Sequence, residues 1–505
     1  MGGLAQERDG RKAVRMKTLA VTVVSIFALL PAAAFATGGL ERPTAVAWIH
    51  HPVSPVAAAQ AAFDRGLMEY YAYNPEAAEH NFYAAADLDR HCAMAYWGIA
   101  VSNAPNLNVD ATHDRSEQAR EAIQQAKSLE KYASAEDRAF IDAASARFDD
   151  QTKASAPVLL AAYRDALQKI AAAYPSDPDA AGLYAESALY VAVGDQSNGS
   201  PAERAARKTR VAALLPLFAS SLARFPNHVG LLHFYIHTAQ LAAKSALAVD
   251  AAMRLASYAL PAEDSHLTHM PGHVFFDVGL YAPAVDVGRR SVAMDFADFA
   301  CCHPGYYSGP RYYHAHNVSF LLYALTETGR LSEALAAARR EDDPYFLAIQ
   351  LVAARDWRGV LAVPYTKGKL RTLPFARGLA FAKLGNAAMA AQARGEIASA
   401  DASSAYDVAV VAAMRATLSG EIAMLAHDDA KALQSLTEAS AQAAKADAIG
   451  AEFPDLYYYS PHMALAALAM RLGRTDVAKA ALQAELNASP RSPIAEKALT
   501  ELASH

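Results

Sequence analysis

Cysteine is scarce in this sequence, which has three, Cys92, Cys301 and Cys302, among 505 residues. Three cysteines can form at most one disulfide bond within the chain, which is too few to stabilise a protein of this length. We therefore expect a packed apolar core to provide its stability. Cys301 and Cys302 precede His303, and this pattern is open to three interpretations: a soft-metal site, a disulfide with Cys92, or plain burial. We assign no chemistry to these cysteines.

An excess of either charge is also missing, because 46 basic residues face 52 acidic ones and give a formal net charge of -6. Phosphate backbones attract strongly basic surfaces, so this balance argues against a nucleic-acid partner. Runs of valine, isoleucine and threonine are few, whereas alanine and leucine are abundant and 53% of the residues are apolar. The composition predicts an all-α protein.

Several enzyme motifs are absent as well. The sequence contains no P-loop, no Gly-x-Gly-x-x-Gly after a strand, no Gly-x-Ser-x-Gly elbow and no His-Glu-x-x-His. These motifs hold phosphates, nucleophiles or zinc ions in many enzymes. The common nucleotide-dependent and hydrolytic chemistries therefore lose support.

A targeting segment opens the chain. Four basic residues between positions 11 and 17 precede the apolar run 19–30, and a small-residue motif follows at 34–36. This pattern is typical of a secretory signal peptide, and the run is shorter than the roughly 20 residues that span a bilayer. We expect a signal peptide at 1–36, a linker at 37–55, no later membrane span, and a periplasmic or secreted protein. The alternative is an uncleaved membrane anchor.

Small residues recur at the spacing of tetratricopeptide hairpins, which are repeats of about 34 residues. In the first copy Gly66 lies in the first helix, Asn74-Pro75 marks the turn, and Ala78, Phe82 and Ala85 face the partner helix. Related spacings recur around Gly279, Gly329, Gly385 and Gly473. The predicted fold is an α-solenoid with N-terminal repeats at 56–226, central repeats at 227–343, and C-terminal repeats at 344–505 that end in a capping helix after Pro490.

The central repeats contain most of the candidate chemistry. His233 and His237 are four residues apart, as are His269 and His273, and residues at this spacing project from one helical face. Aligned on the repeat, both pairs fall on the groove face of their first helices, although Pro271-Gly272 starts or kinks the second of these helices. His316 falls on the same face of the next repeat, and His314 lies two residues before it.

This spacing predicts a transition-metal site whose ligands are His233, His237, His269, His273 and His316. Imidazoles suit copper, zinc or iron, and five of them could hold one or two ions. Asp277 and Glu327 lie further along the groove face and could either act as ligands in a mixed histidine-carboxylate site or orient an imidazole, and Tyr323 is a further candidate for orienting the ligands. We expect metal to be lost as the pH falls through about 6.5, the ordinary imidazole value.

Two functions remain open at this point. With a free coordination position the centre could serve a metal-dependent oxidoreductase or hydrolase that acts on a small molecule. Alternatively, the concave face is a non-enzymatic scaffold that binds a peptide or an envelope protein. The segment 301–311, rich in proline and glycine, is expected to be a loop, either a lid over the groove or a passive connector.

Three blocks of the sequence carry a resemblance. They are His-Phe-Tyr-Ile-His at 233–237, His-Met-Pro-Gly-His at 269–273 and Tyr-Tyr-His-Ala-His-Asn at 312–317. In these blocks, and over most of the mature chain, the sequence resembles exported bacterial tetratricopeptide-repeat proteins rich in His-x-x-x-His blocks. The resemblance implies an α-solenoid with a histidine-lined inner surface. It departs from the family at Ser319, where members often carry a histidine, and at His462, where they carry a basic residue.

Overall fold

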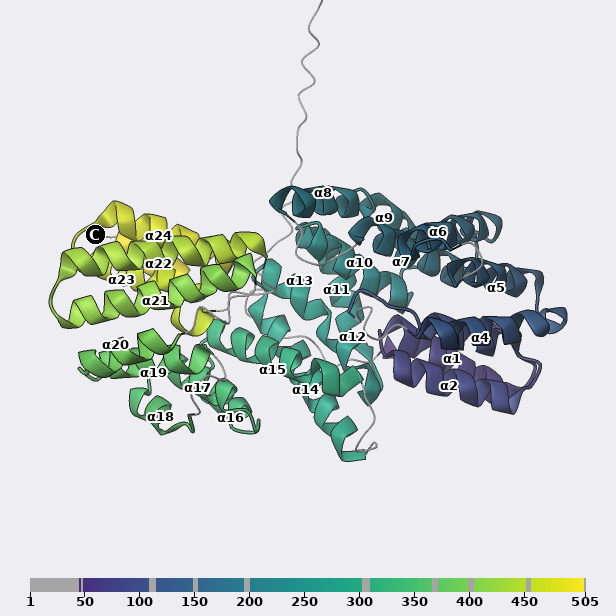
Figure 1. The fold of residues 1–505 in the computed structure, drawn as a ribbon, viewed down its shortest axis with the longest axis horizontal. Helices are drawn as coiled ribbons and strands as arrows, with labels where there is room; N and C mark the ends of the chain where they lie inside the picture. Colours follow the sequence, from purple (N-terminus) through teal and green to yellow (C-terminus); the bar gives the residue numbers. More distant parts are fainter. Residues whose placement is uncertain are drawn as a thin grey trace, which may run out of the picture.

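In the computed structural model, residues 45–46, 49–108, 115–148, 153–194, 200–301, 309–365, 371–397, 404–450 and 456–503 are described. Successive helices form antiparallel hairpins that stack side by side into an elongated array (Figure 1). The predicted all-α solenoid of helical hairpins is confirmed. The signal peptide, Cys302 and residues 37–44 and 47–48 of the linker lie outside the described residues. Of the loop expected at 301–311, residues 302–308 also lie outside them, whereas Cys301 ends one helix and 309–311 begin the next, so the loop is shorter than predicted.

The N-terminal hairpins form one end of the array in Figure 1 and contain α1 (Ala57–Tyr71), α2 (Pro75–Leu88), α3 (Ala93–Ser102), α4 (Ser116–Ser128), α5 (Ala135–Arg147), α6 (Ala156–Ala173), α7 (Pro178–Val193), α8 (Pro201–Ala212) and α9 (Leu215–Arg224). The centre contains α10 (Val229–Leu241), α11 (Val249–Ala256), α12 (Ser265–His269), α13 (Pro271–Asp277), α14 (Tyr281–Cys301) and α15 (Gly309–Glu327). The two-residue strands β1 (Ala45–Val46) and β2 (Tyr258–Ala259) pair in parallel and join the start of the chain to this centre.

The C-terminal end contains α16 (Leu331–Ala338), α17 (Pro344–Ala353), α18 (Trp357–Ala362), α19 (Thr372–Lys383), α20 (Ala387–Glu396), α21 (Ala405–Leu425), α22 (Asp429–Ile449), α23 (Pro461–Arg471), α24 (Thr475–Ala488) and α25 (Pro493–Ala503). Four short 3-10 turns supplement the helices: η2 (Glu130–Tyr132), η3 (Ser245–Ala248), η4 (Ala262–Asp264) and η6 (Tyr457–Tyr459). The prediction that the chain divides into three groups of repeats is not tested by this arrangement.

The first hairpin shows why small residues recur. Phe82 of α2 is fully buried between Gly66 of α1 and Gly98 of α3. A Cβ atom at Gly66 would lie 2.7 Å from the Phe82 ring, and one at Gly98 would lie 2.5 Å from it. Any larger residue at either position would push neighbouring helices apart. Ala78 and Ala85 are also fully buried, as the repeat pattern predicts.

The C-terminal end of the array turns back onto the centre. The turn at 489–492, between α24 and α25, packs against α13, α14 and α15. Tyr281 donates a hydrogen bond to the Pro490 carbonyl at 2.9 Å, and Tyr323 donates one to Ser489 at 2.9 Å. Gly279 has a φ of +72° and lies directly against the Pro490 carbonyl. The last repeat therefore closes on the central repeats, which the expectation of a simple end cap did not foresee.

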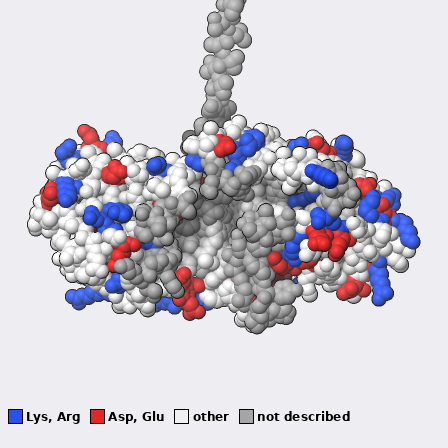
Figure 2. All heavy atoms as spheres, viewed as in Figure 1, with Lys and Arg blue, Asp and Glu red and all other residues white. Residues whose placement is uncertain are grey.

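Helix α21 is the single described helix that is long and apolar enough to cross a membrane. However, 56% of its most apolar window is buried inside the protein, and it packs against α19, α20 and α22. The core helix of a soluble repeat array has the same properties. On the face shown in Figure 2, acidic and basic side chains are interspersed over both ends of the molecule.

Candidate metal centre

Helix α10 supplies the first two imidazoles. His228 caps the helix, because its side chain accepts a hydrogen bond from the Leu231 amide at 3.1 Å. One turn further on, His233 and His237 are both buried, and their Nε2 atoms are 3.0 Å apart. The predicted pairing of these two residues on one helical face is present in the structure.

The second pair spans a break between two short helices. Pro271 has no amide hydrogen to donate, so α12 ends at His269 and α13 begins at Pro271. The predicted start or kink at Pro271 is present, yet it does not displace His269, whose Nε2 lies 2.8 Å from that of His273. Both rings therefore lie on the same side of α12 and α13 despite the break.

Helix α15 contributes His316 to the cluster, whereas its other histidine, His314, has partners elsewhere. The Nε2 atom of His316 lies 2.9 Å from that of His269. His314, two residues earlier, contacts Asp295 at 3.0 Å and Glu341 at 2.8 Å instead. Burial opposes a charge on His314, but the two carboxylates outweigh it and raise its pKa to about 9. His314 is thus an imidazolium held by two carboxylates, outside the cluster.

The structure adds His266, which the sequence analysis did not select. Its ring lies 5.1 Å from that of His233, and one ring nitrogen of each of His233, His237 and His266 lies within 4.8 Å of the others. The Nδ1 atom of His266 is buried and has no hydrogen-bond partner among the described residues. A search limited to pairs four residues apart misses His266, although its spacing of three from His269 also places both on one helical face.

The six imidazoles form two adjacent groups. The first trio is His233, His237 and His266, and the second trio is His269, His273 and His316. Within the second trio, one ring nitrogen of each residue also lies within 4.8 Å of the others. The rings of His266 and His269 are 5.9 Å apart, centre to centre, so the two trios adjoin along α12.

Burial favours the neutral form of four of these imidazoles. It lowers the pKa of His233 to about 3, and it lowers the pKa values of His237, His266 and His269 well below the ordinary range, with neighbouring imidazoles adding to the effect. A neutral imidazole keeps a lone pair that can bind a metal ion. For these four rings the lowered pKa values move the expected competition between metal and protons below pH 6.5, and the loss of metal with falling pH stays a prediction.

One backbone group fixes the orientation of His233. Its Nδ1 atom lies 2.6 Å from the carbonyl oxygen of Tyr71, and a carbonyl only accepts hydrogen bonds. Nδ1 therefore carries the hydrogen, and the lone pair on Nε2 faces His237, as in many metal-ligating histidines. Gly230 allows this approach, because a Cβ atom there would lie 2.5 Å from the Tyr71 ring. The Nε2 atom of Gln240 lies 2.8 Å from Nδ1 of His273. An amide nitrogen only donates, so in this arrangement Nδ1 of His273 accepts and its Nε2 carries the hydrogen, opposite to the arrangement at His233.

Aromatic rings surround both trios. Phe320 packs at 4.6 Å against His269, 4.6 Å against His273 and 4.5 Å against His316, measured between ring centres. Tyr73 lies 4.7 Å from His233, and Tyr313 stacks on His266 at 4.0 Å. Such a lining excludes water and strengthens the binding of any ion held inside.

The three residues predicted to orient the ligands have other contacts. Ser245 donates a hydrogen bond to Asp277 at 2.5 Å, Tyr323 donates one to Ser489, and Glu327 bonds with Ser492. Tyr323 and Glu327 thus take part in the closure of the C-terminal turn onto α15. Their place on the groove face is explained by this closure, and these contacts give no support to a role beside the metal.

The nitrogen spacing suits a metal ion after a small adjustment. Two imidazoles on a tetrahedral ion, each at 2.0–2.1 Å, have nitrogens about 3.3 Å apart. In the second trio the corresponding Nε2 distances from His269 are 2.8 and 2.9 Å, so an ion would require the rings to separate by a few tenths of an ångström. Neither trio contains a carboxylate or a thiolate.

A third cluster has a different character. His51 lies 3.1 Å from Asp137 and 3.3 Å from Asp179, through different ring nitrogens. Burial disfavours the charged ring, but the two carboxylates outweigh it and raise the pKa of His51 well above its ordinary value. Both nitrogens are occupied, so His51 is a structural imidazolium that fastens the N-terminal segment to α5 and α7. The sole cysteine described with its side chain, Cys92, is buried as a free thiol.

Comparison with known proteins gives structural likenesses alone. No protein-family model matches the chain, and no curated protein matches it. The tetratricopeptide domain of P58(IPK) aligns with 83% of this chain and 99% of its own, at 12% identity and a TM-score of 0.21. A structure of Naa15/Naa10 bound to HypK aligns with 85% of this chain and 69% of its own, at 12% identity and a TM-score of 0.18.

Proposed function

We propose that this protein binds two transition-metal ions, one in each histidine trio. The observation that carries the proposal is the convergence of six imidazoles, five buried and one (His316) half-buried, from α10, α12, α13 and α15 into two adjacent groups of three. In the first trio, the buried Nδ1 atom of His266 has no hydrogen-bond partner among the described residues. An ion held by this trio would complete that nitrogen.

The ligand set narrows the choice of metal. Three neutral imidazoles suit copper, zinc or iron, and the lack of carboxylates in either trio favours copper or zinc, since iron centres recruit oxygen ligands more often. Three protein ligands leave a coordination position open for water, dioxygen or another small molecule. We therefore favour a metal-dependent oxidoreductase or hydrolase, with copper the expected ion in the first case and zinc in the second.

A second candidate function follows from the fold. Arrays of helical hairpins often hold a peptide or protein in their concave face, and one of the similar structures is a complex of Naa15/Naa10 with HypK. In this alternative the protein is a scaffold of the bacterial envelope, placed in the periplasm or outside the cell by the signal at 1–36. The imidazoles would then form a hydrogen-bonded network without metal.

Metal analysis of protein produced without a histidine tag separates these functions. The expected result is about two ions of copper or zinc per chain, measured by inductively coupled plasma mass spectrometry after gel filtration. His266→Ala removes a ligand from the first trio and His316→Ala removes one from the second, so each variant should retain about one ion. His314→Ala, on the same helix as His316, is the matched control and should retain two.

The outcomes distinguish the alternatives. A loss of all metal in both single variants would show one shared ion and would contradict the two-site arrangement. Metal-free wild-type protein, with no gain in melting temperature when copper or zinc is added, would leave the scaffold function as the better account. Binding at 100 times the dissociation constant should stabilise the fold by about 2.7 kcal/mol.

A further inference from the structure

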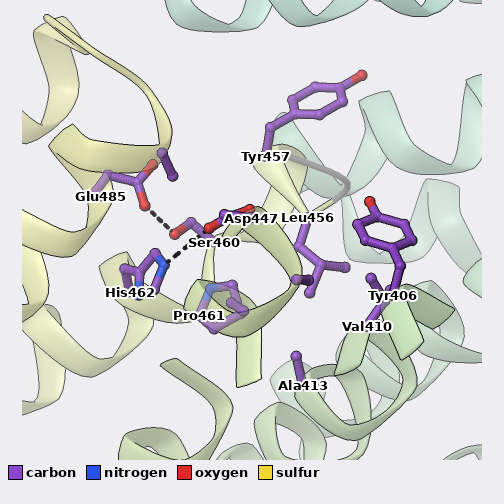
Figure 3. Close-up of a pocket in the computed structure, with 13 residues that line it drawn as sticks. Tyr406, Val410, Ala413, Asp447, Leu456, Tyr457, Ser460, Pro461, His462 and Glu485 are labelled. Carbon is purple, nitrogen blue, oxygen red and sulfur yellow. Dashed lines mark hydrogen bonds and ion pairs between the residues drawn. The ribbon is translucent and has the colours of Figure 1, made fainter. Parts of the chain in front are cut away.

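A cavity lies among the C-terminal helices, away from the six histidines. Its volume is about 450 Å³, and its walls come from α15, α17, α21, α23, α24 and the tyrosines of η6. Pockets that hold small organic molecules have volumes of about 300–1,000 Å³. Figure 3 shows the adjoining smaller cavity of about 20 Å³, which shares Tyr457, Ser460 and Glu485 with this larger one.

Three buried carboxyl groups line the larger cavity, and one of them, Glu421, is paired with Lys383. Glu327 at the end of α15 is 4% exposed and Glu485 of α24 is 6% exposed. Glu485 accepts a hydrogen bond from Ser460, as Figure 3 shows. Glu327 bonds with Ser492, but its Oε2 atom has no hydrogen-bond partner among the described residues. A buried carboxyl oxygen without a partner is costly unless something in the cavity completes it.

The basic side chains of the cavity are directed to other partners. Lys383 pairs with Glu421 at 2.5 Å, and Arg471 pairs with Asp429 at 2.7 Å. Arg355 is exposed at the rim. Among the described residues, no lysine or arginine of this cavity forms an ion pair with Glu327 or Glu485. Among the described lysines and arginines of the cavity, neither Glu327 nor Glu485 therefore has an ion-pair partner.

We infer that this cavity binds an organic ammonium group, with Glu327 as its main acceptor and Glu485 as a second carboxylate nearby. An ammonium carries three N–H donors, one of which can complete Oε2 of Glu327. The apolar remainder of the ligand would pack along Tyr457, Tyr458 and Tyr459. The faces of these rings also attract cations and so favour the ammonium group nearby. An amine, an amino acid or the N-terminus of a peptide fits this description.

The electrostatics of the pair agree with this assignment. Burial and, to a lesser degree, the nearby carboxylate of Glu485 together raise the pKa of Glu327 to about 7, against the opposing hydrogen bond from Ser492. Two buried acids that disfavour each other's ionisation are stabilised by a cation placed between them. A bare metal ion is a poorer occupant, because the cavity is large and the two carboxyls supply few oxygen ligands.

Isothermal titration calorimetry of the full chain, prepared without metal, tests this inference independently of the histidine centre. The probes are 2-phenylethylamine, its N-acetyl derivative, L-phenylalanine and the dipeptide Phe-Ala. The amine should bind, and the neutral acetyl derivative should bind at least tenfold more weakly. Tighter binding of Phe-Ala than of the amine would identify a peptide N-terminus as the ligand, and the reverse order would identify a free amine.

Variants place the binding in the cavity. Glu327→Gln should weaken amine binding at least tenfold, whereas Glu438→Gln, at an exposed position on α22, should leave it unchanged. Ala467 lines the cavity from α23 and is exposed to it, so Ala467→Trp should block binding without disturbing Glu327 or Ser492. Equal binding of the acetylated probe, full binding by the Ala467→Trp variant, or no binding by any probe would each overturn the inference.

Discussion

Replacing Gly279 by alanine tests whether the C-terminal turn closes on the central repeats. Gly279 has a φ of +72°, where an alanine costs about 1–2 kcal/mol in backbone strain. A Cβ atom there would also overlap the Pro490 carbonyl and lie 2.8 Å from Cβ of Arg491. The turn at 489–492 would have to move, and the hydrogen bonds from Tyr281 and Tyr323 would weaken. Two such bonds contribute about 1–3 kcal/mol together.

Gly329 is the matched control for this substitution. It occupies the same position after the first helix of the next repeat, with a φ of +70°, but a Cβ atom there would meet nothing within 4 Å. Gly329→Ala should therefore lose the backbone term alone, about 1–2 kcal/mol. Gly279→Ala should lose about 1–3 kcal/mol more, because it adds the displaced turn.

Urea unfolding followed by circular dichroism measures the difference in free energy of unfolding between the two variants. Small-angle X-ray scattering measures the second consequence, an increase in the radius of gyration that is confined to Gly279→Ala. Equal losses of stability in the two variants, together with unchanged scattering, would refute the closure of the C-terminal turn.

Two further predictions concern the supports of the N-terminal and central repeats. The pKa of His51 is raised in the folded state, so its ion pairs contribute fully to stability below the unfolded pKa of about 6.5, and this contribution is lost as the pH rises through the folded pKa. Wild-type protein should therefore lose stability to urea over this pH range, and His51→Gln should reduce that loss. His50→Gln, at an exposed neighbouring position, should leave it unchanged. Gly230→Ala should push Tyr71 away and break the hydrogen bond from His233 to its carbonyl, which should weaken metal binding by about 10–100-fold in competition titrations. In the control Gly272→Ala, the added Cβ would meet Phe320 at an ordinary 3.5 Å, so this variant should bind metal as the wild type does. Equal affinities in the two variants would contradict the role of the Tyr71 carbonyl.

Much of the helical framework could be predicted from local pattern. Gly66, Ala78, Phe82 and Ala85 lie where the repeat spacing places them, because close helix packing admits few residue types at these positions. The pairs of histidines four residues apart also converge as predicted, since helical geometry fixes their common face. The metal, the reaction, the signal peptide and the cellular location remain predictions.

Other parts of the site depend on contacts between distant segments. His266 joins the first trio because the fold brings its ring to 5.1 Å from that of His233 on α10, and no spacing within one helix reveals such a contact. His314 and His316 are near neighbours in sequence, yet Asp295 and Glu341 bind the first while His269 meets the second. Tyr323 and Glu327 were assigned to the metal because they share its helical face, whereas the turn at 489–492 meets that face about two to three turns beyond His316 on α15.

The sequence by itself determined the helical hairpins and the faces on which the histidine pairs stand, because both follow from periodicities of a few residues. Only the tertiary structure decided the division of six imidazoles into two trios, the depth of their burial, and the closure that forms the carboxyl-lined cavity. These features depend on how far each hairpin rotates against the next, and that rotation is set by the packing of side chains far apart in the chain.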